Sequence, residues 1–221
     1  MTSRSADEVK AEFIQSFPAK TGELACELSW SITHLHLKWK NYRALFGTSP
    51  ERIDLLNHAA PGFFGQLDPI MRHDVVLAIT RLMDPPRTGR HKNASLGGLI
   101  ELLAPHVGAA ELAGWQSELA LLNAAVKPLR AVRDRFVAHE DLATALNYHP
   151  QPLPGFSRAD VEALLERIRG LFNSIEEKFL GSHASHELII ADGGEQLIAS
   201  LERARAQRKN KRGNSRLKQR P

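Results

Sequence analysis

The stretch Arg133-Asp134-Arg135-Phe136-Val137-Ala138-His139-Glu140-Asp141 closes a long helical pattern in this chain of 221 residues. It places an Arg-Asp pair six residues before a histidine. The chain has ten histidines, and no other one follows an Arg-Asp pair at this distance. Charged and ionisable side chains thus gather at the end of a long helical pattern, which makes this stretch the first candidate for chemistry.

The pattern that leads into this stretch predicts a long helix over about 109–140. Apolar residues recur there at steps of three and four, as one face of an α-helix requires. Pro128 lies inside the pattern and should kink the helix or split it in two, because proline lacks the backbone N–H donor. The apolar steps are Leu112, Trp115, Leu119, Leu122, Val126, Leu129, Val132 and Phe136.

Helical patterns also fill most of the chain before this helix. Ser5 with Glu8 fits a capping box for a helix that runs to about Phe17. Ser49-Pro50 and Asp68-Pro69 are typical helix starts, the first of them for a short helix over 50–59. Residues 85–94 read as a polar, basic loop before a short helix that begins at Ser95. The clearest apolar stripe comprises Leu24, Leu28, Ile32, Leu35, Trp39, Tyr42 and Phe46, and Gly47 should end it.

After the central stretch, residues 142–156 are rich in proline and predict an extended loop. Ser157 with Asp160 then opens a further helix, and a last amphipathic helix covers about 194–207. Strictly alternating apolar and polar residues, the mark of a half-buried strand, do not occur over five or more positions. The sequence therefore predicts an all-α helical bundle over residues 1–202.

Charge separates the end of the chain from the rest. Residues 203–221 carry nine Lys and Arg and no acid, which leaves 20 bases and 25 acids in residues 1–202. We expect this basic C-terminal tail to be disordered, because it has too few apolar residues to form a core. It either contacts RNA, DNA or an acidic partner, or only keeps the protein in solution.

The remaining composition favours a cytoplasmic protein. Cys26 is the single cysteine, so neither a disulfide framework nor a cysteine-rich zinc site is expected. Its place in the apolar stripe is typical of a small core residue. Neither a signal peptide nor a run of eighteen apolar residues is present, so we expect no membrane contact.

The geometry of a straight α-helix separates the two functional candidates. With about 100° per residue, Arg133 and His139 lie about 60° to either side of the apolar seam formed by Leu129, Val132 and Phe136. They are thus too divergent to meet within one helix. A homodimer that packs this seam on its own copy gathers both side chains at a shared cleft.

The chemistry of these side chains suits proton transfer and phosphate binding. His139 lies beside Glu140 and Asp141 near a helix C-terminus, and these negative charges favour the protonated imidazole and suit it to proton transfer. The guanidinium of Arg133 suits a phosphate, and Asp134 is placed to orient it or the histidine. Arg135 is an alternative to Arg133, because it lies four residues before the histidine.

This stretch resembles the Arg-x(4–6)-His signature of the HEPN superfamily, and in particular its abortive-infection-type branch. The segment Arg81-Leu82-Met83-Asp84-Pro85, the later Asn93-Ala94-Ser95-Leu96 and the turn at 192–194 are also similar to that branch. The resemblance covers about residues 20–202. It implies a HEPN-like helical bundle and a catalytic site of Arg133, Asp134 and His139 without a cofactor.

The resemblance implies a metal-independent endoribonuclease of a toxin–antitoxin or phage-defence system, with RNA as its substrate and, in the first case, an antitoxin protein as a further partner. Two alternatives stay open: a non-catalytic RNA-binding module, and a dimeric interaction protein. We expect no metal, since His183 and His186 have no second ligand pair nearby in the sequence. His34, His36, Lys38 and Lys40 are expected on the solvated faces of their helix.

Overall fold

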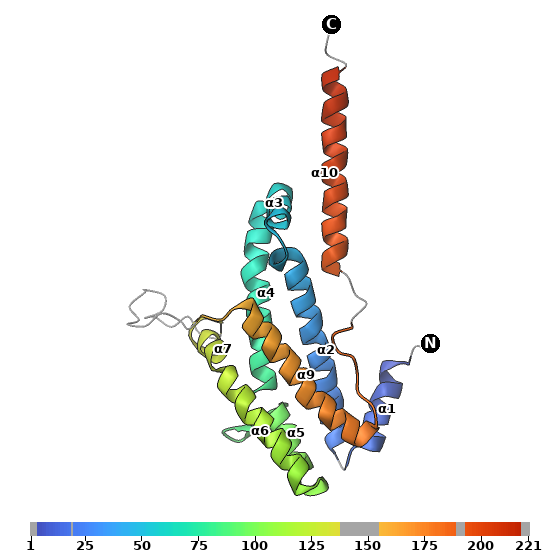
Figure 1. Ribbon diagram of the computed structural model, residues 1–221, viewed down its shortest axis with the longest axis vertical. Coiled ribbons are helices and arrows are strands. Elements are labelled where there is room, and N and C mark those ends of the chain that lie inside the picture. Colours follow the sequence, from blue (N-terminus) through green and yellow to red (C-terminus); the bar gives the residue numbers. More distant parts are fainter. Residues whose placement is uncertain (1–3, 19, 138–154, 189–192, 218–221) are drawn as a thin grey trace. The chain divides into compact units, whose positions relative to one another are not determined.

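The computed structural model describes residues 4–18, 20–137, 155–188 and 193–217, and helices make up most of them (Figure 1). The prediction of an all-α protein is confirmed. The chain forms two compact units, each built from two segments. The first contains Met1–His36 and His73–Leu188, and the second contains Leu37–Arg72 and Ile189–Pro221. The two units are described separately below.

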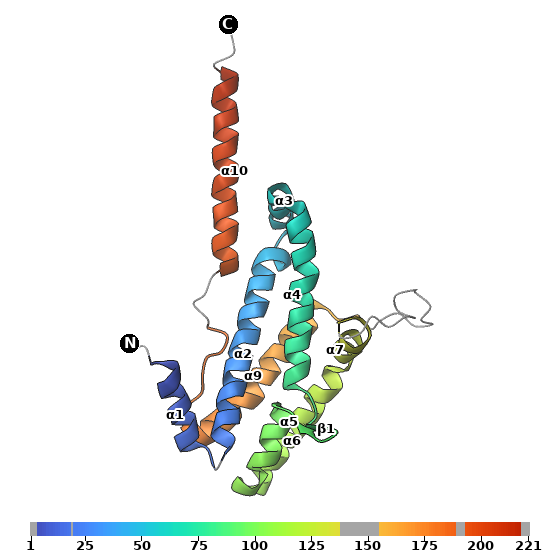
Figure 2. The ribbon, with the colours of Figure 1, turned by 180° about the vertical axis from the view of Figure 1, so that it is seen from behind.

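The first unit contains most of the helices. Helix α6 packs against α9 and α5, and α1 packs against α9; Figures 1 and 2 show α6 and α9 side by side. Helices α2 and α4 each belong to both units. The elements of the first unit are α1 (Ala6–Ser16), α2 (Thr21–Tyr42), α4 (Pro61–Leu82), β1 (Arg87–Thr88), β2 (His91–Lys92), α5 (Leu96–Leu103), the 3₁₀ turn η2 (Ala104–His106), α6 (Ala109–Ala125), α7 (Lys127–Val132), the π-helical turn η3 (Arg133–Val137) and α9 (Arg158–Leu180).

The core of the first unit is formed by the apolar stripes that the sequence predicts. Leu28, Ile32 and Leu35 of α2 are buried, as are Leu122 of α6 and Phe172 of α9. Burial of apolar side chains is the main favourable term in folding, so these stripes fix which face of each helix points inward.

Capping residues and a proline place several helix ends where the sequence predicts them. Ser5 and Ser157 both form capping boxes, at the starts of α1 and α9. The long central helix is split: α6 ends at Ala125 and α7 begins at Lys127, with Pro128 in its first turn. Proline is tolerated there because the first turn of a helix has no intrahelical partner for its N–H groups.

In the second unit, the last helix packs against helix α3 (Pro50–Ala59) and the π-helical turn η1 (Arg43–Gly47). This last helix is α10 (Gly193–Leu217). The core of the unit contains Leu45, Leu55, Leu56, Phe64 and Ile198.

Gly194, the second residue of helix α10, lies at a close approach of two segments. A Cβ on this residue would lie 2.8 Å from the Cβ of Ala44, so only glycine fits. Its N–H donates to Oδ1 of Asn41 at 2.9 Å. The turn at 192–194 thus begins the docking of α10, although Asp192 itself lies outside the described residues.

Two predicted features near α4 differ in the structure. Asp68-Pro69 does not start a helix, because α4 runs continuously from Pro61 to Leu82. Pro69 removes only the hydrogen bond to the carbonyl of Gly65, which is exposed and open to water. The basic loop at 85–94 folds as the β1–β2 hairpin, whose turn contains Gly89 at φ +58°.

The C-terminal tail also differs from the prediction, since α10 continues as a helix to Leu217. The prediction of disorder rested on charge, whereas Ala, Arg, Lys and Gln all favour helix formation. Ile198 and Leu201 anchor the first half of α10 in the core of the second unit, and the helix extends from there. The predicted boundary after residue 202 therefore falls inside a helix, while the predicted loop over 142–154 lies outside the described residues.

Across the described ranges, no helix has the length and apolarity that crossing a lipid bilayer requires.

Candidate functional site

The candidate site lies where α7 passes into the π-helical turn η3 (Arg133–Val137). A π-helical turn inserts extra backbone into a helix, and such turns are frequent at functional sites. The end of α4 approaches this turn and contributes Met83 and Asp84. Residues far apart in the sequence therefore meet at the first residue of the stretch that resembles the HEPN signature.

Arg133 is held by two carboxylates. Its Nη1 donates to Oδ1 of Asp84 at 2.9 Å, and its Nε donates to Oδ1 of Asp134 at 2.7 Å. The Arg133 side chain is 23% exposed, so the guanidinium is oriented from one side and still reaches solvent. A guanidinium has five N–H donors, and these two contacts leave donors that can bind a phosphate oxygen.

Arg130, one turn earlier, fixes the same junction from the interior. Its Nη2 donates to the carbonyl oxygen of Met83 and, at 2.8 Å, to Oδ1 of Asn123. Met83 follows the last residue of α4, where unpaired carbonyls attract a cation. Burial lowers the pKa of Arg130 from its ordinary value. Arg130 thus joins α7 to the end of α4 and thereby places Arg133.

Arg133 stays positively charged in this setting. Burial works against the charged form, but the hydrogen bonds to Asp134 and Asp84 outweigh it and raise the pKa of Arg133 above its ordinary value. Arg133 is therefore a permanent cation flanked by two acids. An incoming phosphate has to compete with these acids for the guanidinium.

The structure brings together only part of the predicted site. Asp134 contacts Arg133, as its proposed orienting role requires. Arg135 is half-buried in the same turn, and His139 lies outside the described residues. The separation of about 120° between Arg133 and His139 assumed a straight α-helix, whereas the backbone is π-helical after Val132.

One residue of the predicted dimer seam is buried within the single chain. Leu129 is only 1% exposed in the single chain, so its side chain is already covered. It packs in the core of its own unit and is not available to a second copy. Val132 is half-buried.

Asp84 is the residue of this site that the sequence did not single out for a role. It stands in the segment Arg81–Pro85 that resembles the segment before the motif helix of the HEPN branch. An acid at a helix end opposes the helix dipole, so a cationic partner is expected there. The position of Asp84 therefore predicts a cationic partner but does not identify that partner as Arg133.

A second polar cluster, in the interior of the first unit, was also missed. His186 and Glu176 are each 1% exposed, with 3.5 Å between Nε2 and Oε2. Nδ1 of His186 lies 2.8 Å from Oγ1 of Thr33. Glu176 also accepts from the Ser29 hydroxyl at 3.1 Å and from the Ala184 N–H at 2.9 Å. The sequence does indicate this cluster at one point. Glu176 follows Phe172 by four residues, so the two side chains share the inward face of the helix.

His36 adjoins this cluster rather than the solvated face where it was expected. Burial lowers the pKa of His36 from 6.5 to about 4, and repulsion from His186 and Arg169 adds to the shift. His36 is therefore neutral at physiological pH. His183, by contrast, is exposed and lies 3.2 Å from Glu177.

Within the described part of the chain, no three His, Cys, Asp or Glu side chains converge so that they could hold a metal ion.

Comparison with known families gives one result. The family model HEPN_AbiU2, described as AbiU2, matches residues 19–206, which is most of the chain. The match includes the end of α4, the turn η3 and the stretch 133–141. No curated protein and no solved structure matches the chain significantly.

Proposed function

This chain belongs to the AbiU2 family of HEPN proteins, and from this premise we propose that it is a metal-independent endoribonuclease of an abortive-infection system. The residues proposed to carry the activity are Arg133, Asp134 and His139. The single observation that best supports the proposal is the placement of Arg133. It is oriented by Asp84 and Asp134 and remains partly open to solvent, six residues before His139.

The proposed reaction uses the 2′-hydroxyl of the RNA as the nucleophile. This oxygen attacks the adjacent phosphorus, the bond from phosphorus to the 5′-oxygen breaks, and the products carry a 2′,3′-cyclic phosphate and a 5′-hydroxyl. A proton leaves the 2′-hydroxyl and another is delivered to the 5′-oxygen. A histidine that titrates near neutral pH is suited to either transfer, which assigns this role to His139.

Arg133 would stabilise the negative charge that develops on the phosphate oxygens. Such stabilisation is strongest when the cation is already oriented before the substrate binds. Asp84 and Asp134 provide that orientation and leave part of the guanidinium fork free. Asp134, which is 59% exposed, can turn away from Arg133 at little cost when a phosphate arrives.

The proposed active form is a homodimer. One histidine cannot abstract one proton and donate another at the same instant, whereas two copies supply two histidines to a shared cleft. Because Leu129 is covered within its own chain, the contact between copies would use other residues of the central stretch. An antitoxin protein that covers this cleft would silence the enzyme.

A non-catalytic RNA-binding role is the second candidate, and one observation favours it. Two acids already neutralise Arg133, so it stabilises the negative charge that develops during cleavage less than an unpaired arginine would. In this alternative, Arg133 and His139 hold RNA without cutting it.

The test is RNA cleavage by the purified protein in the presence of EDTA. Wild type should produce fragments that end in a cyclic phosphate, and His139→Ala should slow cleavage by about 10²–10⁴-fold, the usual contribution of a proton-transfer group. The exposed His183→Ala serves as the matched control and should cut at the wild-type rate. Cleavage that needs added divalent metal, or that His139→Ala leaves unchanged, rejects the proposal. Binding without cleavage selects the second candidate.

A further inference from the structure

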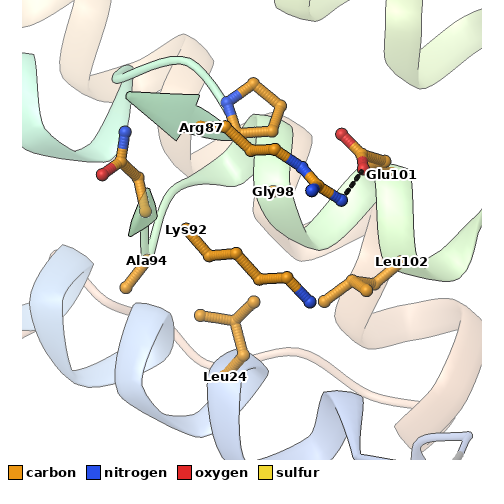
Figure 3. Close-up of a pocket in the computed structure, with 9 residues that line it drawn as sticks. Leu24, Arg87, Lys92, Ala94, Gly98, Glu101 and Leu102 are labelled. Carbon is orange, nitrogen blue, oxygen red and sulfur yellow. Dashed lines mark ion pairs between the residues drawn. The ribbon is translucent and has the colours of Figure 1, made fainter. Parts of the chain in front are cut away.

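A pocket of about 210 Å³ lies between the β1–β2 hairpin, α5 and the start of α2 (Figure 3). Leu24 and Leu102 form apolar walls. Arg87, Lys92 and Glu101 bring charges to its rim. In Figure 3 the Lys92 side chain extends between Leu24 and Leu102, and the Arg87 guanidinium points toward Glu101. The pocket thus combines apolar walls with two cationic side chains.

The pocket is held in place by specific contacts of the hairpin. Nδ2 of Asn93 donates to the carbonyl of Pro85 and to Oγ1 of Thr88, each at 2.8 Å. A Cβ on Gly98 would lie 2.8 Å from the carbonyl oxygen of Asn93. Only glycine therefore allows α5 to approach the hairpin this closely. The arrangement is a preformed site, as small-molecule pockets usually are.

The charge of the hairpin favours an anion. Residues 85–94 carry Arg87, Arg90, Lys92 and His91 and no acid. Glu101 lies 3.5 Å from Arg87, but both side chains are more than half exposed. Exposed pairs of this kind are weak, so a phosphate can displace Glu101 from Arg87.

Chain connectivity places this pocket next to the candidate catalytic site. Pro86 lines the pocket and follows Asp84, the partner of Arg133, by two residues. Two residues span at most about 7 Å, so the pocket wall and the Arg133 cluster are neighbours. Neighbouring nucleotides of one strand can therefore occupy both places.

We propose that this pocket binds one nucleotide unit, with its phosphate on Arg87 and Lys92 and the flat face of its base against Leu24 and Leu102. A base has an apolar face, which suits such walls, while cations hold the phosphate. The identification of the strand as RNA rests on the proposed function. The nucleotide chemistry rests on the pocket alone, so a free nucleotide is the other source of the same ligand.

The test measures the affinity of a short fluorescent single-stranded RNA, with all variants made in His139→Ala so that the probe stays intact. The double variant Arg87→Gln with Lys92→Gln should lower the affinity about tenfold. It should also flatten the slope of log affinity against log salt by about 0.7 for each phosphate that the protein no longer neutralises. Glu101→Gln should raise the affinity, because it releases Arg87 and removes a charge that repels phosphate. Arg4→Gln, from the exposed pair with Glu12, is the control and should change neither quantity.

The double variant and Glu101→Gln are expected to change RNA affinity in opposite directions. A variant that only damages the hairpin should lower affinity, so damage does not explain a rise with Glu101→Gln. Adenosine 5′-monophosphate is titrated as a second probe. Sensitivity of either probe to the double variant, with the opposite effect of Glu101→Gln, supports the pocket. Unchanged affinity and salt dependence for both probes overturns it. Failure of the wild type to cut RNA rejects the endoribonuclease and leaves this result standing.

Discussion

The polar clusters around Arg133 and around His186 differ in one respect that separates their roles. Both join residues far apart in the sequence, Arg133 to Asp84 in one cluster and His186 to Thr33 in the other. The Arg133 side chain is 23% exposed and its partner Asp134 is 59% exposed. His186 and Glu176 are sealed in the core, where Thr33, Ser29 and the backbone of Ala184 contact them, while Nε2 of His186 has no hydrogen-bond partner among the described residues.

The difference follows from the cost of burying polar groups. A buried polar group that lacks a partner costs free energy, so most polar atoms of the sealed cluster bond to one another or to the neighbouring backbone. The cluster at Arg133 is partly exposed, so a ligand can approach it. We therefore expect substitutions in the sealed cluster to lower stability and substitutions in the open cluster to lower activity.

The largest expected effect is on catalysis at the open cluster. Arg133→Lys keeps the charge but loses the planar fork, so the rate of RNA cleavage should fall about 10²-fold or more while the melting temperature hardly changes. Arg135→Lys, two residues further on, is the matched control and should retain most of the activity. Cleavage and thermal melting are measured on the same preparations. If Arg135→Lys loses activity and Arg133→Lys does not, the catalytic arginine has been misassigned.

The second effect is on stability at the sealed cluster. Glu176→Leu leaves the Ser29 hydroxyl and the Ala184 N–H without their acceptor and removes the carboxylate beside His186. The free energy of unfolding should therefore fall by about 3 kcal/mol. Glu177→Leu is the matched control, because Glu177 pairs with His183 at the surface and such pairs contribute under about 1 kcal/mol. Urea denaturation gives both values. Activity per folded molecule should stay at the wild-type level in each variant, and a loss there would contradict the separation of roles.

Helix positions could be predicted because they depend on nearby residues. The capping boxes at Ser5 and Ser157 and the split at Pro128 are local signals, and each occurs as expected. The prediction of a helix start at Asp68-Pro69 was wrong because the cost of a proline inside a helix depends on its surroundings. Gly65, one turn earlier, leaves the affected carbonyl open to water, and sequence spacing alone does not show that.

The partners in both clusters could not be predicted because they come from distant segments. Asp84 and Arg133 are 49 residues apart, and Thr33 and His186 are 153 apart. Helical periodicity shows which face a side chain occupies, but not which element packs against that face. The resemblance to a known family placed the open cluster by its motif. It offered no motif for the sealed one.

The third prediction tests whether RNA affinity comes from the open cluster or from the diffuse charge of the basic C-terminal tail. Truncation after Glu202 removes nine Lys and Arg but keeps Ile198 and Leu201, which pack in the core of the second unit. RNA affinity at moderate salt should fall about tenfold with a flatter salt dependence, while cooperative unfolding persists. An unchanged salt slope would show that the tail does not contact the RNA, and loss of cooperative unfolding would show that the fold requires it.

The smallest expected effect concerns pH at the edge of the sealed cluster. The folded protein holds the pKa of His36 at about 4, below its ordinary value of 6.5, so the unfolded chain binds more protons between these two values. The free energy of unfolding should therefore fall as the pH drops from 6.5 toward 4, by on the order of 1 kcal/mol once solvent around the half-buried ring is allowed for. His36→Gln removes the titrating group and should flatten this part of the pH profile, measured by urea denaturation. His34→Gln, two residues earlier on the exposed face of the same helix, should leave the profile unchanged. Equal pH profiles for wild type and His36→Gln would mean that the sealed cluster admits enough water to accommodate a charged imidazole, and the contrast with the open cluster would then be weaker than their exposure indicates.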